Sequence, residues 1–171
     1  MERLDTERLT LIPMTDSARW ALLHGQSWLS GVPGSFASGW PAPDLLGLLE
    51  HHPAQPDEDG DRAGWEPWLL IHREDAALVG DAGFHAPPDG RGEVEIGYSV
   101  AVGYRGRGLA TEAVLALVRW ALDRGATAVV ARSDAGNLAS ARVLTKAGFY
   151  QTGQVGDEIA WRFQPAPKDH A

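Results

Sequence analysis

Arg105-Gly-Arg-Gly-Leu-Ala110 stands between an alternating segment, Glu93–Val100, and an amphipathic segment that ends near Arg124. The spacing predicts a strand, a tight glycine turn and a helix. The first N–H groups of such a helix have no partner within it and lie at the positive end of its dipole, so they favour an anion such as phosphate. The stretch therefore predicts a phosphate-binding turn. The alternative is a plain glycine turn that carries two solvated arginines.

Two common nucleotide-binding motifs do not fit this turn. A mononucleotide P-loop needs Lys and then Ser or Thr after its second glycine, whereas Gly108 is followed by Leu109 and Ala110. A dinucleotide fingerprint needs a third small residue and an acidic residue about 20 positions on, whereas Glu112 falls inside the predicted helix. A nucleotide-dependent transferase is therefore the weaker interpretation.

The pattern around the turn predicts one mixed α/β domain. The domain is expected to span residues 1–171, with a core at 6–163 and a C-terminal tail at 164–171. Strands are predicted at 6–13, 68–72, 77–84, 93–100 and 128–131, with a closing pair in 149–163. Helices are predicted from an Asp16 cap to Leu23, at 44–51, at 109–124 and from Asn137 to Ala147. Residues 56–61 are expected to form a solvated loop.

The composition excludes several classes of function. Asp and Glu outnumber Lys and Arg by 23 to 15, for a formal net charge of −8, so neither nucleic acid nor an anionic membrane surface is an expected partner. The absence of cysteine excludes disulfides, thiolate metal sites and cysteine nucleophiles, and fits the cytoplasm. No apolar run approaches the ~20 residues that cross a bilayer. No metal site is expected either, because His51 and His52 would point apart on a helix and lack a third ligand.

The turn and its surroundings resemble the GCN5-related N-acetyltransferases, the GNAT superfamily. The hallmark of that family is Gln/Arg-x-x-Gly-x-Gly/Ala between a strand and a helix, and Arg105, Gly108 and Ala110 match its fixed positions. Further segments resemble the branch that contains the ribosomal-protein N-terminal acetyltransferases: Glu95-Ile-Gly-Tyr98, Ala110-Thr-Glu-Ala113, Asn137-Leu-Ala-Ser140 and Lys146-Ala-Gly-Phe149. The resemblance is strong over residues 68–153 and poor over 28–67.

The resemblance implies a fold and an activity. The fold is a central, mostly antiparallel twisted sheet flanked by helices, whose fourth and fifth strands splay apart into a cofactor cleft. The activity is transfer of an acetyl group from acetyl-CoA to a primary amine, by direct attack through a tetrahedral intermediate. The acceptor is a protein N-terminus or a small-molecule amine, and a homodimer is a common state in the family. A non-catalytic member that binds acetyl-CoA or a partner is the alternative.

The resemblance also implies the residues that bind acetyl-CoA. Backbone N–H groups would wrap the pyrophosphate along Arg105, Gly106, Arg107, Gly108, Leu109 and Ala110. The strand end at Ser99 and Val100 would pair its backbone with the pantetheine arm and polarise the thioester carbonyl. Asn137 would contact pantetheine or a water molecule, a role that is compatible with capping its helix.

Two side chains are the predicted catalytic residues. Glu95 lies where the family often places the base that deprotonates the amine, with Glu93 or water as alternatives. Many relatives carry a tyrosine acid seven positions after the helix-opening Asn, but this chain has Leu144 there. Ser140 would instead hydrogen-bond or protonate the CoA sulfur, unless it is a small packing residue.

Other aromatic and histidine side chains carry weaker expectations. His72 and His85 are expected to be ordinary strand-end residues. Four tryptophans flank the variable region and would either pack in the core or line a substrate pocket: Trp28, Trp40, Trp65 and Trp68.

Overall fold

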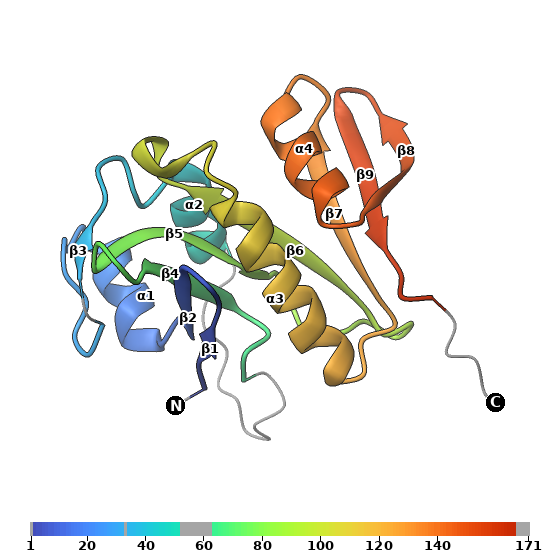
Figure 1. The fold of residues 1–171 in the computed structure, drawn as a ribbon. Helices are drawn as coiled ribbons and strands as arrows, with labels where there is room; N and C mark the ends of the chain where they lie inside the picture. Colours follow the sequence, from blue (N-terminus) through green and yellow to red (C-terminus); the bar gives the residue numbers. More distant parts are fainter. Residues whose placement is uncertain (1, 33, 52–62, 167–171) are drawn as a thin grey trace.

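The computed structural model describes residues 2–32, 34–51 and 63–166, and Figure 1 shows its fold. Within these residues nine strands form one sheet in the order β1-β2-β4-β5-β6-β7-β9-β8, with β3 beside β5. The strands are β1 (Leu4–Asp5), β2 (Leu9–Pro13), β3 (Ser35–Phe36), β4 (Pro67–His72), β5 (Ala77–Phe84), β6 (Glu93–Val100), β7 (Ala128–Asp134), β8 (Tyr150–Val155) and β9 (Glu158–Phe163). The helices are α1 (Asp16–Leu23), α2 (Pro43–His51), α3 (Leu109–Asp123) and α4 (Leu138–Lys146), with a 3₁₀ turn, η1, at Val102–Tyr104. The expected mixed α/β, mostly antiparallel fold is confirmed.

Helices cover both faces of the sheet (Figure 1). Helix α3 carries its apolar stripe, including Val114 and Leu117, onto the face that β2, β4 and β6 line with Leu9, Leu70 and Ile96. Helix α4 adds Leu144 to the same cluster, and its C-cap residue Ala147 packs there too. On the opposite face, α1 and α2 contribute Leu22, Leu45 and Leu49 to a second cluster with Leu69, Ile71 and Leu78. These two apolar clusters fix the sheet between the layers.

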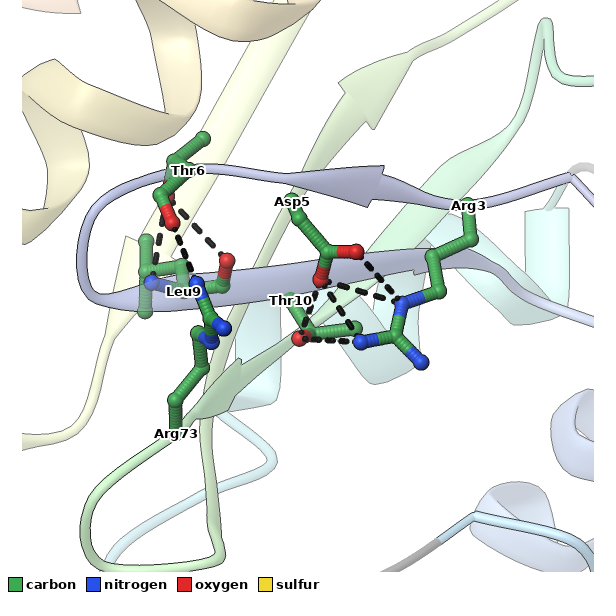
Figure 2. A network of polar contacts seen from close by, with 6 residues as sticks. All are labelled: Arg3, Asp5, Thr6, Leu9, Thr10 and Arg73. Atoms are coloured by element: carbon green, nitrogen blue, oxygen red, sulfur yellow. Dashed lines mark hydrogen bonds and ion pairs between the residues drawn. The ribbon is translucent and has the colours of Figure 1, made fainter.

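The predicted strand at 6–13 begins later than expected, because residues 6–8 turn the chain between β1 and β2. Figure 2 shows Thr6 at this turn, where its hydroxyl donates to the Leu9 carbonyl at 3.2 Å. Asp5 and Thr10 sit opposite each other on the two strands and are joined by a 2.8 Å hydrogen bond, with Arg3 paired to Asp5 (Figure 2). The short hairpin is therefore held by its own polar side chains.

Other element boundaries also differ from the sequence-based expectation. Thr15 rather than Asp16 caps α1, since its side chain accepts the N–H of Ala18. Strand β7 continues from the predicted end at Ala131 to Asp134, because β9 pairs with it over that whole length. The predicted loop at 56–61, His52 and residues 167–171 of the predicted tail lie outside the described residues.

Strand β5 contains one extra residue relative to β4. The register passes from Leu70 opposite Gly80 to Ile71 opposite Leu78, so Val79 has no partner on β4 and forms a bulge. Because side chains alternate between faces along a strand, the bulge exchanges the faces of the residues that follow it. Val79, Ala82 and Phe84 all join the cluster under α3, while Asp81 lies on the opposite face with Leu78.

Strands β6 and β7 run parallel and pair at one end only. Their register joins Glu93 to Ala128, Val94 to Val129 and Glu95 to Val130, and then the pairing stops. Both strands continue beyond that point, to Val100 and Asp134. Figure 1 shows the two strands meeting at one end and diverging toward α4. The expected splaying of the two central strands is therefore present.

Candidate active site

The glycine turn lies at the end of the cleft and opens α3. Gly108 is the N-cap of α3 with φ +80°, a left-handed conformation that favours glycine, and it offers no side chain to cap the helix. An added Cβ at this position would lie 3.3 Å from the Arg8 guanidinium. Leu109 anchors the turn because its side chain is fully buried in the core. Gly108 therefore leaves the first backbone N–H groups of α3 without a side-chain cap, and their binding of an anion stays a prediction.

The two arginines of the turn are held by backbone carbonyls. Arg105 donates from Nε to the Val100 carbonyl at 2.8 Å, and Arg107 donates from Nη2 to the Gly103 carbonyl at 2.8 Å. The Arg107 guanidinium also lies 5.0 Å from the centre of the Tyr104 ring. These contacts fix both positive charges beside the helix start, which favours the phosphate-binding role over two freely solvated arginines.

Arg8 fastens the turn from a distant part of the chain. Its Nη1 donates to the Arg107 carbonyl at 2.6 Å, and its Nε donates to Glu112 in the first turn of α3 at 2.8 Å. Glu112 also accepts the Thr6 hydroxyl at 2.6 Å and the Arg8 backbone N–H at 2.7 Å. Burial tends to raise the pKa of the Glu112 carboxyl, but these hydrogen bonds outweigh it and hold the pKa below its usual value. The acid is thus kept ionised where it braces the turn.

The backbone of β6 faces two ways along the cleft. Ser99 is in register with Asp81 on β5, and the bonds at both ends of this ladder, Ala101 N–H to Val79 O and His85 N–H to Glu95 O, place the Ser99 backbone groups toward β5. Tyr98 and Val100 therefore turn their N–H groups toward the side that β7 leaves open. Of the two residues predicted to pair with pantetheine, Val100 has its backbone in the cleft. The backbone of Ser99 faces β5 instead, and only its side chain is directed to the cavity.

A cavity of about 400 Å³ opens between the parted strands and α2. Its walls come from α2, β5, β6, β7 and the start of α4, with Pro67 of β4 and Glu158 of β9. It contains Ser99, Asn137 and Ser140 of the predicted site, and also Tyr98, Asp81 and His85. The structure thus brings together residues that are far apart in the sequence.

Ser140 and Asn137 lie at the start of α4. Asn137 is the N-cap, and its Oδ1 accepts the Ser140 N–H at 3.0 Å, so the expected capping role is confirmed. The Ser140 hydroxyl lies 2.7 Å from the phenol oxygen of Tyr98. Burial raises the pKa of Tyr98, and the bond to Ser140 offsets part of that rise. Leu144, one turn further along, is fully buried.

Glu95 lies where β6 and β7 begin to part, because it is the last β6 residue paired with β7, and it does not lie on the wall of the cavity. Its carboxylate lies 3.3 Å from Arg132 Nε and 3.7 Å from His85 Nδ1, and it does not line the cavity. Glu93 lies behind it and is paired with Arg162 at 2.7 Å. Each carboxylate therefore has its own arginine. Glu93, which was expected to be a simple exposed strand-start residue when it is not the base, is instead part of an ion pair.

Asp81 is the buried carboxylate that the sequence analysis missed. It is 7% exposed, and its Oδ1 accepts hydrogen bonds from Ser99 Oγ at 2.7 Å and from Trp40 Nε1 at 2.9 Å. Burial raises the pKa of Asp81 to about 6, against the effect of these two bonds, and nearby Asp44 adds to the rise. A perturbed carboxyl in a cavity is typical of functional sites.

The remaining expectations are resolved by burial. Trp40, Trp65 and Trp68 are buried in the apolar clusters, whereas Trp28 is exposed. His72 is a buried strand-end residue paired with Asp75, but His85 lies in the cavity and was not predicted there. Its position directly after the β5 strand was the available signal. Over residues 2–32, 34–51 and 63–166, no three His, Cys, Asp or Glu side chains are grouped to hold a metal ion, and no helix could span a membrane.

Comparison with known proteins shows which family the chain belongs to. Residues 8–150 match the acetyltransferase (GNAT) domain model. An uncharacterized N-acetyltransferase of Bacillus subtilis, YjdG, is 28% identical over 166 residues, which cover 94% of this chain and 97% of that protein. The chain belongs to the GNAT acetyltransferase family and is an enzyme of the N-acetyltransferase class.

Solved structures share the fold at low sequence identity. A ribosomal-protein-S5-alanine acetyltransferase from Vibrio fischeri superposes with a TM-score of 0.66 at 16% identity, over 96% of this chain and 97% of that one. The microcin C7 self-immunity acetyltransferase MccE, solved with acetyl-CoA and AMP, superposes with a TM-score of 0.64 at 14% identity, over 94% of both chains. The ribosomal-protein enzyme comes from the branch that the sequence motifs resemble.

Proposed function

We propose that this enzyme transfers the acetyl group of acetyl-CoA to a primary amine. The observation that carries the proposal is the end-to-end arrangement of the glycine turn and the parted strands. The turn presents bare helix N–H groups to a pyrophosphate, and β6 presents the N–H groups of Tyr98 and Val100 to an extended arm beside it. An anionic head joined to a slim amide-bearing chain fits both parts at once. Acetyl-CoA is a molecule of that shape, and MccE, of similar fold, was solved with it.

The turn would hold the pyrophosphate mainly through its backbone. The segment from Arg105 to Ala110 supplies the N–H groups, and Gly106 and Gly108 leave no side chain in the way. Arg105 and Arg107 add positive charge whose position is already fixed by carbonyl contacts. Charge-assisted bonds of this kind are typically worth about 1.5–3 kcal/mol each.

Strand β6 would bind the pantetheine arm and the thioester. Acetyl-CoA supplies the activated acetyl carbon, and the chain supplies N–H donors at Tyr98 and Val100 that face the open side of the strand. A fixed N–H donor stabilises the negative charge that develops on the carbonyl oxygen as the amine attacks. The Nδ2 group of Asn137 is available to the same arm, since only Oδ1 is used by the helix cap.

The departing sulfur would be met by a hydroxyl pair rather than by a lone phenol. Ser140 lies at the helix start and Tyr98 reaches it across the cleft at 2.7 Å. When the phenol of Tyr98 donates to the Ser140 hydroxyl, that hydroxyl can point its own proton at the sulfur, and the proton it delivers is replaced from the phenol. The pair thereby takes the place of the tyrosine acid that many relatives carry at the position of Leu144.

Glu95 is proposed as a proton acceptor that acts through an intermediary. Its carboxylate is held by Arg132 and faces the Nδ1 atom of His85 at 3.7 Å, and the His85 ring lines the cavity. A proton can therefore reach Glu95 through the imidazole or a water molecule. The acceptor would occupy the cavity, which α2 lines together with the parted strands. A protein N-terminus and a small amine both stay open as acceptors, and the homodimer and cytoplasmic location stay predictions.

The test is a mass-spectrometric acceptor screen. Purified protein is incubated with acetyl-CoA and a panel of amines and N-terminal peptides, and both the acetylated product and the free CoA thiol are quantified. We expect equal amounts of product and thiol for at least one acceptor. Binding of acetyl-CoA with no transfer to any amine would instead support the non-catalytic alternative.

A further inference from the structure

Asp81 has an arrangement that a structural carboxylate does not need. Both donors that reach it, Ser99 Oγ and Trp40 Nε1, end on the same oxygen, Oδ1. None of the described residues donates a hydrogen bond to Oδ2. Since no buried side-chain oxygen or nitrogen among the described residues lacks a partner, Oδ2 must reach the open space of the cavity that Asp81 lines. Oδ1 is therefore held by two hydrogen bonds, and Oδ2 is available to a bound ligand.

No cation in the described residues compensates the charge of this carboxylate. Among the described residues, Arg132 is the one arginine on the cavity wall, and it lies on β7 across the cleft, where it pairs with Glu95 and Glu158. Besides the Tyr98 phenol, the other charged or titratable groups that the described residues place on the cavity wall are mostly acidic: Asp44 from α2, His85 after β5, Asp134 from β7 and Glu158 from β9. Burying an anion without an opposite charge costs free energy, so a positively charged ligand is favoured at Oδ2.

We propose that Asp81 binds the acceptor as an ammonium ion and takes its first proton, so that it is a catalytic residue of the acetyl transfer. The inference rests on the proposed function. It names a residue that neither the family motifs nor the sequence pattern assigns. It also defines the acceptor as an amine that enters in its charged form.

The position of Asp81 relative to the hydroxyl pair supports this role. Asp81 is paired across the sheet with Ser99, which directly follows Tyr98, and the phenol of Tyr98 contacts Ser140. The sulfur contact and the carboxylate thus belong to one short stretch of β6. Glu95 lies further along the strand, at the last residue paired with β7, and outside the cavity wall. Of Asp81 and Glu95, Asp81 is therefore the carboxylate that an amine in the cavity meets directly.

The proton balance of the step can be written in full. The ammonium loses one proton to Asp81 Oδ2, and the freed lone pair attacks the thioester carbon and forms the C–N bond. The nitrogen then loses a second proton, toward His85 and Glu95 or water, and the C–S bond breaks with its electron pair on sulfur. Sulfur takes one proton through Ser140 and Tyr98. One proton is released to solvent for each amide and each thiol formed.

The experiment compares kcat/KM across pH 5–9.5 for wild type, Asp81→Asn and Glu95→Gln. Asn keeps an oxygen for Ser99 and Trp40 and removes only the charge, so the fold is expected to persist, which circular dichroism checks. Base catalysis is typically worth ~10²–10⁴-fold, so kcat/KM of Asp81→Asn should be lower by that factor near pH 7. In wild type, kcat/KM should fall as the pH drops through about 6 and Asp81 is protonated, and Asp81→Asn should lack this acid limb. Asp123→Asn, an exposed change at the end of α3, should match wild type.

The Glu95→Gln profile separates the two carboxylates. That variant should be slower than wild type but keep the limb near pH 6. Acetyl-CoA affinity, measured by calorimetry, should be unchanged in Asp81→Asn. The inference is overturned if Asp81→Asn keeps the wild-type limb, or if Glu95→Gln alone abolishes it. A wild type that acetylates no amine would overturn the proposed function itself, which is a different result from a fast Asp81→Asn enzyme.

Discussion

The glycine turn and the Asp81 environment use opposite means to hold charge. The turn gathers its groups within Arg105–Ala110, uses mainly backbone N–H donors and is largely exposed. The Asp81 environment gathers side chains from β5, β6, α2 and the segment before α2, and it is buried. The turn requires only a helix end with its ordinary dipole. The buried carboxylate requires the fold to tolerate an anion away from water.

This difference shows which parts of an active site carry a stability cost. Unpaired N–H groups at an exposed helix start are solvated when no ligand is present, so they cost little. Asp81 is buried even when no ligand is present, so its ionised form carries a desolvation cost in the folded protein. A carboxylate kept under those conditions is typical of residues retained for activity rather than for folding.

The largest expected effect is on stability, and it tests the cost of burying the ionised Asp81 carboxylate. The pKa of Asp81 rises from 3.8 to about 6 on folding, so its contribution favours the fold below pH 4 and is lost as pH rises through 6. At pH 8 the loss amounts to about 3 kcal/mol, because one pKa unit corresponds to ~1.4 kcal/mol. Asp81→Asn should therefore be more stable than wild type at pH 8, with the gap closing toward pH 4. Urea denaturation at several pH values measures it.

Asp157→Asn supplies the matched control for this measurement. Asp157 is exposed in the turn between β8 and β9, so its replacement should give the same small difference at every pH. A pH-independent gap for Asp81→Asn as well would mean that burial of the charge carries no cost, and the contrast with the turn would fail.

Gly108→Val tests the other side of the comparison. The valine Cβ would be forced into the left-handed region and toward Arg8, so the backbone could no longer approach a pyrophosphate. Binding of CoA should weaken by about 2–3 kcal/mol, the scale of a lost hydrogen bond to a charged group. Calorimetry measures the affinity, and Gly47→Ala on α2, where the Cβ has open space, should bind as wild type does. Unchanged affinity for Gly108→Val would remove the cofactor assignment.

The hydroxyl pair is expected to give a smaller effect. Ser140→Ala should slow the chemical step roughly tenfold to thirtyfold, near the lower end of a bond to a charged group. Tyr98→Phe should act through the same serine, so the double variant should be little slower than Ser140→Ala. Single-turnover rates measure the step without product release. Additive losses would show that the two hydroxyls act separately, and a wild-type rate for Ser140→Ala would return Ser140 to a packing role.

Arg8→Met sharpens the comparison with the smallest change. Arg8 does not belong to the turn, yet it bonds the Arg107 carbonyl and Glu112. Because its side chain is partly exposed, the ion pair is worth little, and losing the brace should weaken CoA binding by about 1 kcal/mol or less. Calorimetry compared with Arg3→Met, which breaks an exposed hairpin contact instead, isolates the effect. Equal affinities for both variants would show that the turn holds itself.

Local patterns in the sequence predicted the elements and the turn well. The β5 and β6 boundaries and the cap at Asn137 follow from apolar alternation, glycine placement and capping residues, all of which act within a few positions. The glycine turn was also visible, because all of its groups are contiguous. The Ser140 and Tyr98 contact was not, since it joins two segments through their tertiary placement.

Asp81 could not be predicted because a bulge decides its face. Strict alternation from Ala77 places Asp81 beside Val79, on the apolar side under α3. The extra residue at Val79 moves Asp81 to the opposite side, toward Trp40 and Ser99. A β-bulge has no clear sequence signal here, because it depends on how β4 and β5 align. The same limit applies to Ser99, whose backbone direction follows from the register with β5.

The parted strands have a further consequence for the chain before it meets its substrate. Beyond Glu95 and Val130, β6 and β7 each expose a strand edge in the middle of the sheet rather than at its rim. Free edges invite pairing with other chains, and proteins usually block them. Here residues of both edges, such as Tyr98 and Ser133, line one cavity of about 400 Å³, a space that suits an extended arm rather than a second sheet. The cleft therefore keeps a reactive edge available to a ligand while shielding it from self-association.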